Sequence, residues 1–347
     1  MAPAANSQSV ASAALDKADV SARQPARDSY PPASSIPTTS AARLAKSAEG
    51  ATQGLDASAS DTVLYLAYGS NMCAKTFLGV RGIRPLSQVN VAAPSIRLTF
   101  DLPGVPYREP CFANVGFRNV PEEKKAHRAE SVHQDMEWDG SLIGIVYEVT
   151  QKDYRTIMRT EGAGSSYKEI VVPCYPIAPK ETFPKGPTPF LARTLYAAYN
   201  SNGDDNRRWW QRLLDGRQRP DPNYAQASLR YLNLLRDGGR EHDLPASYQK
   251  YLASLHSYMT TRWTQKVGQY VFLALWAPLL IFILSMTGFL ADETGKLPPW
   301  LAKGVAMLFN VMWMSYDVAF KPIFGDGERT EEENSEDEGS LVGNVKA

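Results

Sequence analysis

The feature that most restricts the fold of this chain is an uninterrupted apolar run near its C-terminal end. Residues 270–290 read YVFLALWAPLLIFILSMTGFL and contain no charged side chain. That length matches the roughly 20 residues that a helix needs to cross the hydrocarbon of a bilayer. A buried core helix is the alternative, but a core helix is seldom apolar on every face. We therefore predict a transmembrane helix over residues 266–292. Its aromatic neighbours Trp263, Tyr270 and Trp300 are expected at headgroup level.

A second apolar stretch follows at residues 300–320, but Lys303, Asn310 and Asp317 interrupt it. For residues 293–324 three alternatives stay open: an interfacial amphipathic helix, a second span, or a helix packed on the first. Basic residues precede the first run, whereas acidic residues follow it. Cytosolic flanks of membrane helices are enriched in Lys and Arg. We therefore expect a single-pass or two-pass membrane protein whose N-terminal part faces the cytosol, with residues 270–290 in contact with the lipid bilayer.

The two ends of the chain differ in composition from its middle. Residues 1–60 are rich in Ala, Ser, Pro and Thr, and residues 325–347 are acidic and polar. Such segments bury too little apolar surface to offset their ordering entropy, so we predict a disordered N-terminal tail and an acidic disordered C-terminal tail. The 37 basic and 37 acidic side chains cancel, which argues against a nucleic-acid-binding protein. Three widely spaced cysteines, without a Cys/His cluster, favour a reducing compartment and predict no metal site.

Residues 61–265 form the predicted folded domain. Short apolar runs typical of strands occur at residues 63–68, 96–100, 111–115, 142–149, 167–174 and 191–199. A helix is predicted from Gln151 to Arg159, because Thr150 offers an N-cap. Apolar residues at helical spacing dominate residues 204–265, and Gly238-Gly239 is interpreted as a break between helices. Strands that precede helices favour an α+β domain over a doubly wound sheet.

Two short motifs carry the candidate chemistry. Tyr68-Gly69-Ser70-Asn71 follows the first predicted strand, and a Gly-Ser-Asn turn there presents backbone N–H groups that suit a carboxylate. Taken alone, such a motif is more often only a turn. Glu161 lies between a predicted helix and Gly162, among apolar strands. A partly desolvated carboxyl at this place has a raised pKa that suits proton transfer. A solvated Glu at a helix end is the commoner alternative.

Taken together, the stretches LYLAYGSNM, LIGIVYEV and MRTEGAGSSYKEIVV resemble the gamma-glutamylcyclotransferase family. The resemblance covers residues 62–258 and implies an α+β fold: a gamma-glutamylcyclotransferase-like mixed β-barrel flanked by helices, here with a C-terminal transmembrane helix. It implies that Tyr68, Gly69, Ser70 and Asn71 bind the γ-glutamyl group. It also implies that Glu161 is the catalytic acid/base and that Tyr167 contacts the substrate. The interval from Glu161 to Tyr167 is one residue shorter than in some members.

The resemblance implies an enzyme of the lyase or acyltransferase type that needs no cofactor. It would cyclise a γ-glutamyl group to 5-oxoproline and release an amino acid, peptide or amine. The apolar C-terminal segment further resembles fungal members associated with secondary metabolite biosynthesis, which implies a glutathione conjugate as substrate. Two alternatives stay open. One is a gamma-glutamylamine- or glutathione-specific cyclotransferase. The other is a membrane-tethered protein of the same fold that binds without catalysis.

Overall fold

The computed structural model describes residues 30–53, 61–118, 138–160, 168–177, 189–197, 224–290 and 298–331. Glu161 and Tyr167, two of the residues predicted for the site, lie outside these ranges. So do residues 204–223, the first third of the helical region predicted over residues 204–265.

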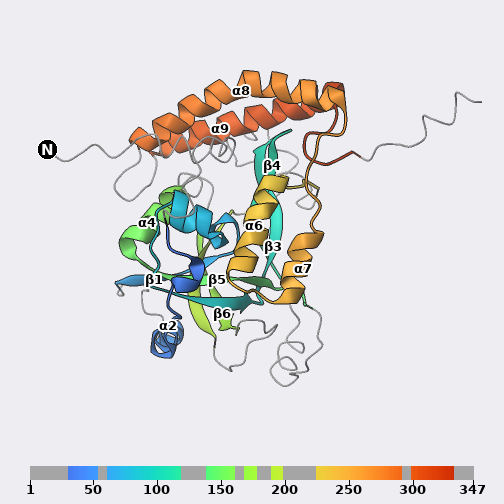
Figure 1. The fold of residues 1–347 in the computed structure, drawn as a ribbon. Coiled ribbons are helices and arrows are strands. Elements are labelled where there is room, and N and C mark those ends of the chain that lie inside the picture. The colour runs from blue at the N-terminus through green and yellow to red at the C-terminus, as the bar shows by residue number, and fades with distance from the viewer. Residues whose placement is uncertain are drawn as a thin grey trace, which may run out of the picture.

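A closed five-stranded barrel forms the centre of the molecule (Figure 1). The strands follow one another around it in the order β1 (Thr62–Ala67), β5 (Leu142–Thr150), β2 (Ser87–Ala93), β6 (Lys168–Pro176) and β7 (Phe190–Tyr196). Neighbouring strands are antiparallel except β1 and β7, which run parallel and close the barrel. Side chains on both faces of β1 and β5 are buried, which explains why these two strands read as continuous apolar runs. The predicted mixed barrel is confirmed.

Strands β3 (Ile96–Val105) and β4 (Glu109–Phe117) form a separate hairpin beside the barrel. At its tip Tyr107 has a left-handed backbone with φ of 64° and a fully buried side chain. Its hydroxyl donates to the carbonyl of Gly325 (2.9 Å), and its own N–H donates to the carbonyl of Gly327 (2.7 Å). A left-handed conformation is costly for a bulky residue, so contacts with the C-terminal segment hold the tip in place.

Three helices border the barrel: α4 (Gln151–Thr160), α6 (Leu229–Glu241) and α7 (Ala246–Ser254). The predicted N-cap of α4 is confirmed, since the Thr150 hydroxyl accepts from the N–H of Asp153 at 3.1 Å. Ser228 caps α6 in the same way through the N–H of Tyr231. Gly238 and Gly239 lie inside α6, so the predicted helix break at this pair is wrong. The reason is a close approach to the barrel, described with the site below.

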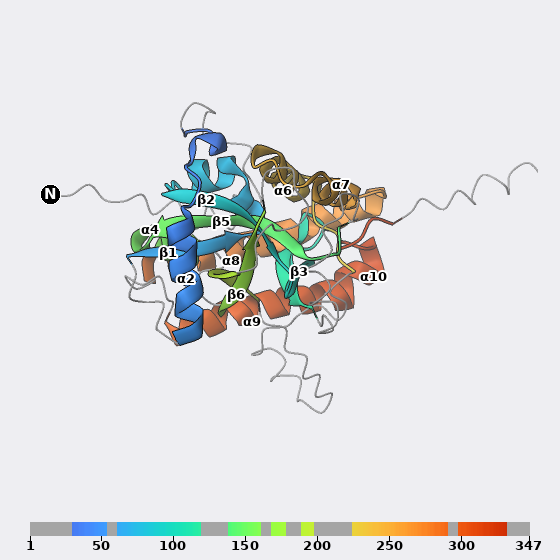
Figure 2. The ribbon, with the colours of Figure 1, turned by 90° about the horizontal axis from the view of Figure 1, so that it is seen from below.

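Part of the N-terminal region is ordered, so the prediction of a tail without structure is wrong for residues 30–53. Helix α2 (Ala41–Gln53) lies against the barrel (Figure 2). Arg43 forms an ion pair with Glu148 of β5 at 2.9 Å, and the Ser47 hydroxyl donates to the carbonyl of Leu191 in β7 at 2.7 Å. The composition of this segment is poor in large apolar residues, so polar contacts with the barrel supply much of what holds it.

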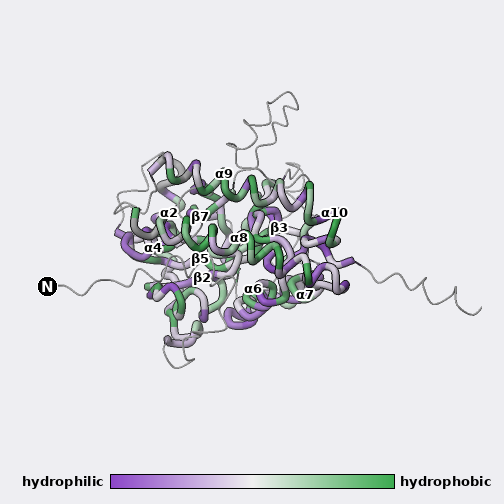
Figure 3. Tube along the Cα trace, turned by 90° about the horizontal axis from the view of Figure 1, so that it is seen from above, coloured by the Kyte–Doolittle hydropathy of each residue, from purple (hydrophilic) through white to green (hydrophobic). Residues whose placement is uncertain are grey.

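The apolar C-terminal region forms a layer of helices above the barrel (Figure 3). Helix α8 (Trp263–Leu290) is followed by α9 (Pro299–Ser315), by the π-helical turn η7 (Tyr316–Phe320) and by α10 (Lys321–Phe324). A buried cluster joins this layer to the hairpin tip; it contains Tyr107, Phe272, Trp276, Leu280, Met312, Trp313, Tyr316 and Phe320. Helix α9 therefore packs beside α8, which is one of the three alternatives left open by the sequence.

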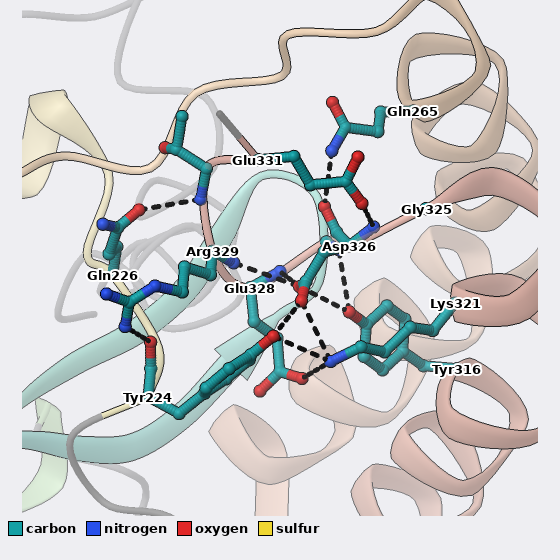
Figure 4. A network of polar contacts seen from close by, with 12 residues as sticks. Tyr224, Gln226, Gln265, Tyr316, Lys321, Gly325, Asp326, Glu328, Arg329 and Glu331 are labelled. Carbon is teal, nitrogen blue, oxygen red and sulfur yellow. Dashed lines mark hydrogen bonds and ion pairs between the residues drawn. The ribbon is translucent and has the colours of Figure 1, made fainter. Parts of the chain in front are cut away.

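The first residues of the predicted acidic tail are also ordered, so that prediction is wrong for residues 325–331. Asp326 and Glu328 are buried (6% and 0% exposed) and pair with Lys321 at 3.0 and 3.7 Å (Figure 4). Asp326 also accepts hydrogen bonds from the hydroxyls of Tyr224 and Tyr316. Buried carboxylates are stable only when paired and hydrogen-bonded. The composition of the segment indicates charge but not these partners, which come from distant parts of the chain.

Candidate active site

The loop predicted to bind substrate begins where β1 ends. The Tyr68 hydroxyl donates to the carbonyl of Leu195 in β7 at 2.7 Å, and the Asn71 side-chain amide donates to the Tyr65 hydroxyl at 2.8 Å. Ser70 and Asn71 are buried and enter a single 3-10 turn, Ser70–Met72. Within the described chain, the backbone N–H groups of Gly69 and Ser70 have no hydrogen-bond acceptor. The flanking side chains are therefore fixed, while two adjacent N–H groups are available to an anion.

The C-terminal end of α6 holds the residues that directly follow this loop. Gly238 approaches Met72 so closely that a Cβ at this position would lie 2.6 Å from the Met72 Cβ. A carboxylate oxygen of Glu241 accepts from the N–H of Ala74 at 2.7 Å. The Nε2 of His242 lies 3.1 Å from the Met72 carbonyl oxygen and 2.8 Å from the Tyr147 hydroxyl of β5. Three residues of α6 and its C-cap thus fix the chain just after Asn71.

Burial favours the neutral forms of two titratable side chains near this loop, His242 and Cys73. Desolvation lowers the pKa of His242 to about 4, because burial disfavours the charged imidazolium. Desolvation and the nearby Glu241 raise the pKa of the Cys73 thiol to about 11. A thiol with so high a pKa is a poor nucleophile at neutral pH, and the Cys73 side chain is buried against the core (1% exposed), as expected for a packing residue.

Described residues on either side of the segment that contains Glu161 and Tyr167 have partners on neighbouring elements. Thr160, the last residue of α4, accepts a hydrogen bond from Arg81, which follows the π-helical turn η5 (Lys75–Val80) after the loop. On the far side, Glu169 of β6 accepts a hydrogen bond from Tyr154 of α4 and pairs with Arg193 at 2.8 Å. Tyr154 in turn contacts Tyr65, the partner of Asn71, with ring centroids 6.2 Å apart.

These contacts bring the start of the Glu161 segment to the element that follows the loop. The positions of the Glu161 and Tyr167 side chains themselves lie outside the described residues, so their roles stay predictions.

Comparison with known proteins decides the family. The chain is 32% identical to the gamma-glutamyl cyclotransferase gliK of Aspergillus fumigatus over 267 residues, which is 77% of this chain and 89% of that protein. It is 31% identical to the gamma-glutamyl cyclotransferase aclK of Aspergillus oryzae over 276 residues, 77% of this chain and 90% of that protein. The chain belongs to the gamma-glutamyl cyclotransferase family. The family resemblance predicted from the three motifs is thereby confirmed.

Other similarities concern parts of the chain. Residues 262–323 match the family described as the AclK C-terminal domain, so the layer of α8 to α10 is a recognised unit within the family. A solved gamma-glutamyl cyclotransferase structure is 16% identical, covering 58% of this chain and 92% of its own, with a TM-score of 0.37. The structural similarity to that protein is too low to add to the family assignment.

Several residues at this candidate site were not predicted from the sequence. Gly238, Glu241 and His242 contact the chain next to the loop from about 170 positions away, and no local pattern announces such a contact. The pair of glycines inside a helical pattern is the signal that could have indicated this contact, because a glycine within a helix can allow another chain segment to approach closely. Tyr231 is a further example, with its hydroxyl 3.2 Å from the position that a Cβ on Gly69 would occupy.

Proposed function

We propose that this chain is a gamma-glutamyl cyclotransferase that converts a γ-glutamyl compound to 5-oxoproline and a free amine. The observation that carries the proposal is the pair of available N–H groups at Gly69 and Ser70. They lie in a loop whose side chains are held from β1 and β7, in a chain whose relatives are named for this activity. These groups suit the α-carboxylate of a γ-glutamyl substrate, and Asn71 and Tyr68 shape the wall beside it.

The reaction requires little beyond folding of the substrate and one proton carrier. The α-amine of the substrate attacks its own γ-carbonyl carbon, so a new C–N bond forms while the C–N bond to the leaving amine breaks. In the proposed mechanism Glu161 removes a proton from the α-ammonium group and later delivers it to the leaving nitrogen. Ring closure is intramolecular, and holding the γ-glutamyl chain in a folded conformation keeps the α-amine close to the γ-carbonyl carbon, which speeds the reaction. No water is consumed, and Tyr167 is proposed to contact the substrate.

Glutathione S-conjugates are the substrate class that we propose first, because the apolar C-terminal segment resembles that of fungal members associated with secondary metabolite biosynthesis. The chain shares 77% of its length with two gamma-glutamyl cyclotransferases from Aspergillus species. The leaving group is then the cysteinyl end of the conjugate. Glutathione itself, γ-glutamyl amino acids and γ-glutamylamines are the other classes to compare. The identity of the leaving group depends on the width of the site beyond the γ-carbonyl.

The decisive experiment measures 5-oxoproline released from these four substrate classes by the full chain and by two carboxyl variants. Glu161→Gln is expected to lower kcat by about 10²–10⁴-fold, the range of a general acid/base contribution. Glu169→Gln is the matched control, because Glu169 is a neighbouring carboxylate that is engaged by Tyr154 and Arg193. Equal turnover by Glu161→Gln and the unmodified chain would overturn the assignment of Glu161. Failure of the unmodified chain on every class would instead favour the binding protein without catalysis.

A further inference from the structure

The exposed face of α8 is apolar along most of its length. Exposed positions recur every three to four residues and form what is here called the outer stripe: Val267, Tyr270, Val271, Ala274, Leu275, Pro278, Leu279, Ile281 and Phe282. Tyr270, Leu275 and Phe282 are 73%, 53% and 66% exposed. At 1.5 Å per residue the stripe is about 23 Å long. A helix on a water-facing surface presents polar residues there, so a continuous apolar stripe marks an interaction surface.

Basic side chains border the outer stripe, and one of them, Arg262, pairs with Glu331 at 3.1 Å. Arg262 and Lys266 continue its periodicity at the N-terminal end, and Lys303 is exposed on α9. Neither α8 nor α9 contains an acidic residue. Trp263 and Trp300 are 75% and 62% exposed, and exposed tryptophans are typical of the membrane–water boundary. The surface is therefore complementary to anionic lipid headgroups. If a second copy of the chain packed its own α8 and α9 against this face, those helices would offer no acidic residue to pair with the basic ones.

The inner side of the same helix is fixed to polar groups of the catalytic domain. The side-chain amide of Gln265 donates to the carbonyl of Asp326 at 3.0 Å, and that of Gln269 donates to the carbonyl of Tyr107 at 2.5 Å (Figure 4 shows the first). Around Asp326 lie Lys321, at 3.0 Å, and Glu328, which is 3.7 Å from Lys321.

These contacts restrict how α8 meets a bilayer. The helix is long and apolar enough to cross one over residues 263–283, with 22% of that window buried in the molecule. A crossing in this fold would carry the hairpin tip and the charged groups around Asp326 into hydrocarbon, where unsolvated charges and irregular backbone are costly.

We propose that α8 lies in the plane of the membrane surface, with the outer stripe inserted among anionic lipids and the catalytic domain on the aqueous side. In this orientation the inner contacts with Gln265 and Gln269 stay intact, because they face the domain. Shallow insertion of a helix of this kind depends on buried apolar area and on attraction of basic residues to anionic headgroups. The chain is then a monotopic protein rather than one that spans the bilayer.

Vesicle flotation with the full chain tests the outer stripe. We expect flotation with vesicles of phosphatidylcholine and phosphatidylserine, and weaker flotation with phosphatidylcholine alone. The double substitution Leu275→Glu with Leu279→Glu is expected to weaken partition at least about tenfold, because two apolar side chains leave the lipid. Val171→Glu with Leu229→Glu is the matched control, since these side chains are equally exposed (50% and 49%) on β6 and α6. Lys266→Ala should weaken binding to the anionic vesicles alone by about fivefold.

Single-cysteine labelling distinguishes the planar from the spanning arrangement. The three native cysteines are buried, so Trp263→Cys and Leu290→Cys provide exposed thiols at the two ends of α8. In sealed microsomes from cells that express the full chain, an impermeant maleimide should label the thiols at both positions to the same extent. Labelling of one end with protection of the other would overturn the proposal in favour of a span.

Two other results would also overturn the proposal. One is an unchanged flotation of the Leu275→Glu, Leu279→Glu variant. The other is the absence of flotation together with a concentration-dependent doubling of mass that the same variant abolishes, which would assign the face to a second copy. Release of 5-oxoproline by the variant is measured in parallel and should equal that of the unmodified chain. Loss of membrane binding is thereby separated from loss of the proposed function.

Discussion

At the scale of single residues, His242 is one of the groups that hold the chain after the candidate loop, and its neutral state in the fold can be tested by pH. Its pKa falls to about 4 in the fold because burial disfavours the imidazolium, whereas an unfolded histidine titrates at about 6.5. The unfolded chain therefore binds the proton first. The contribution of His242 to stability is complete above about pH 6.5 and is lost progressively as the pH falls to about 4. Denaturant unfolding across that range measures it.

His242→Gln provides the control for this pH dependence, because glutamine keeps polar atoms near the Tyr147 hydroxyl and the Met72 carbonyl but does not titrate. Its stability should change less than that of the unmodified chain between about pH 6.5 and 4. Glu148 and Asp326 have lowered pKa values, so their contribution to stability is lost at lower pH than that of His242. The hydrogen bonds that these carboxylates accept are lost only when the carboxylates are protonated. An identical slope in the variant would show that another group is responsible.

Two adjacent glycines in α6 provide a matched pair of substitutions. A Cβ on Gly238 would lie 2.6 Å from the Met72 Cβ and 2.8 Å from the Cys73 nitrogen, whereas a Cβ on Gly239 meets its nearest atom, in Leu252, at 3.5 Å. Gly238→Ala should destabilise the fold by about 1–3 kcal/mol through overpacking and should lower kcat/KM, because the displaced chain leads directly into the loop. Gly239→Ala should stabilise by up to about 1 kcal/mol, the helix propensity gain. Denaturant unfolding and 5-oxoproline release report both effects; equal behaviour of the two variants would contradict the packing role.

At the scale of elements, α2 is held on the barrel chiefly by Arg43. Its guanidinium reaches Glu148 at 2.9 Å and the Thr62 hydroxyl at 3.3 Å. Burial raises the pKa of Glu148, but hydrogen bonds from Thr62, Ser87 and Arg43 outweigh burial and lower it overall. Arg43→Ala should cost about 1–3 kcal/mol, since it removes a hydrogen bond to a charged group that is mostly buried. Lys46→Ala on the exposed side of the same helix should change the free energy of unfolding by less than about 0.5 kcal/mol.

The same helix shows what the sequence pattern predicts and where it stops. Strands β1 and β5 were predicted because their continuous apolar runs reflect burial on both faces. Helix α2 was missed, because its residues bury little apolar surface and its order depends on Glu148, about 100 positions away. For the site, the loop motif at residues 68–71 is local and was recognised. The residues of α6 that hold it are remote in sequence, and neither periodicity nor spacing connects them to the loop.

At the scale of the whole molecule, the C-terminal layer and the barrel form one packed unit. The backbone N–H of Gln226 donates to the carbonyl of Glu328 at 2.8 Å, two residues before the Ser228 cap of α6. From that cap the helix runs to Gly238 and His242 at the candidate loop. A continuous set of contacts thus joins the C-terminal layer to the candidate loop. The proposed membrane surface therefore orients the catalytic domain directly, without a flexible linker between them.

Asp326 connects the C-terminal layer to the rest of the molecule, since it contacts Tyr224, Tyr316 and Lys321. Burial alone would raise the pKa of Asp326. Hydrogen bonds from Tyr224, from the N–H of Glu328 and from Lys321 outweigh burial and lower this pKa overall, so Asp326 stays ionised. Asp326→Ala leaves the Lys321 ammonium with a more distant carboxylate at 3.7 Å. Removing one partner of a buried pair typically costs about 3–5 kcal/mol. The layer should loosen first, so we expect a lower Tm and a red shift of tryptophan emission from Trp276 and Trp313, which lie in the buried cluster.

Asp237→Ala is the control, because the Arg240–Asp237 pair is 65% and 47% exposed and a surface pair contributes about 0–1 kcal/mol. An Asp326→Ala chain with unchanged emission and Tm would show that the apolar cluster alone holds the layer. A chain with shifted emission and weakened 5-oxoproline release would show that the loop senses the layer through α6. Since Gln226 and Ser228 are the first contacts along that path, the second outcome is the one that the structure favours.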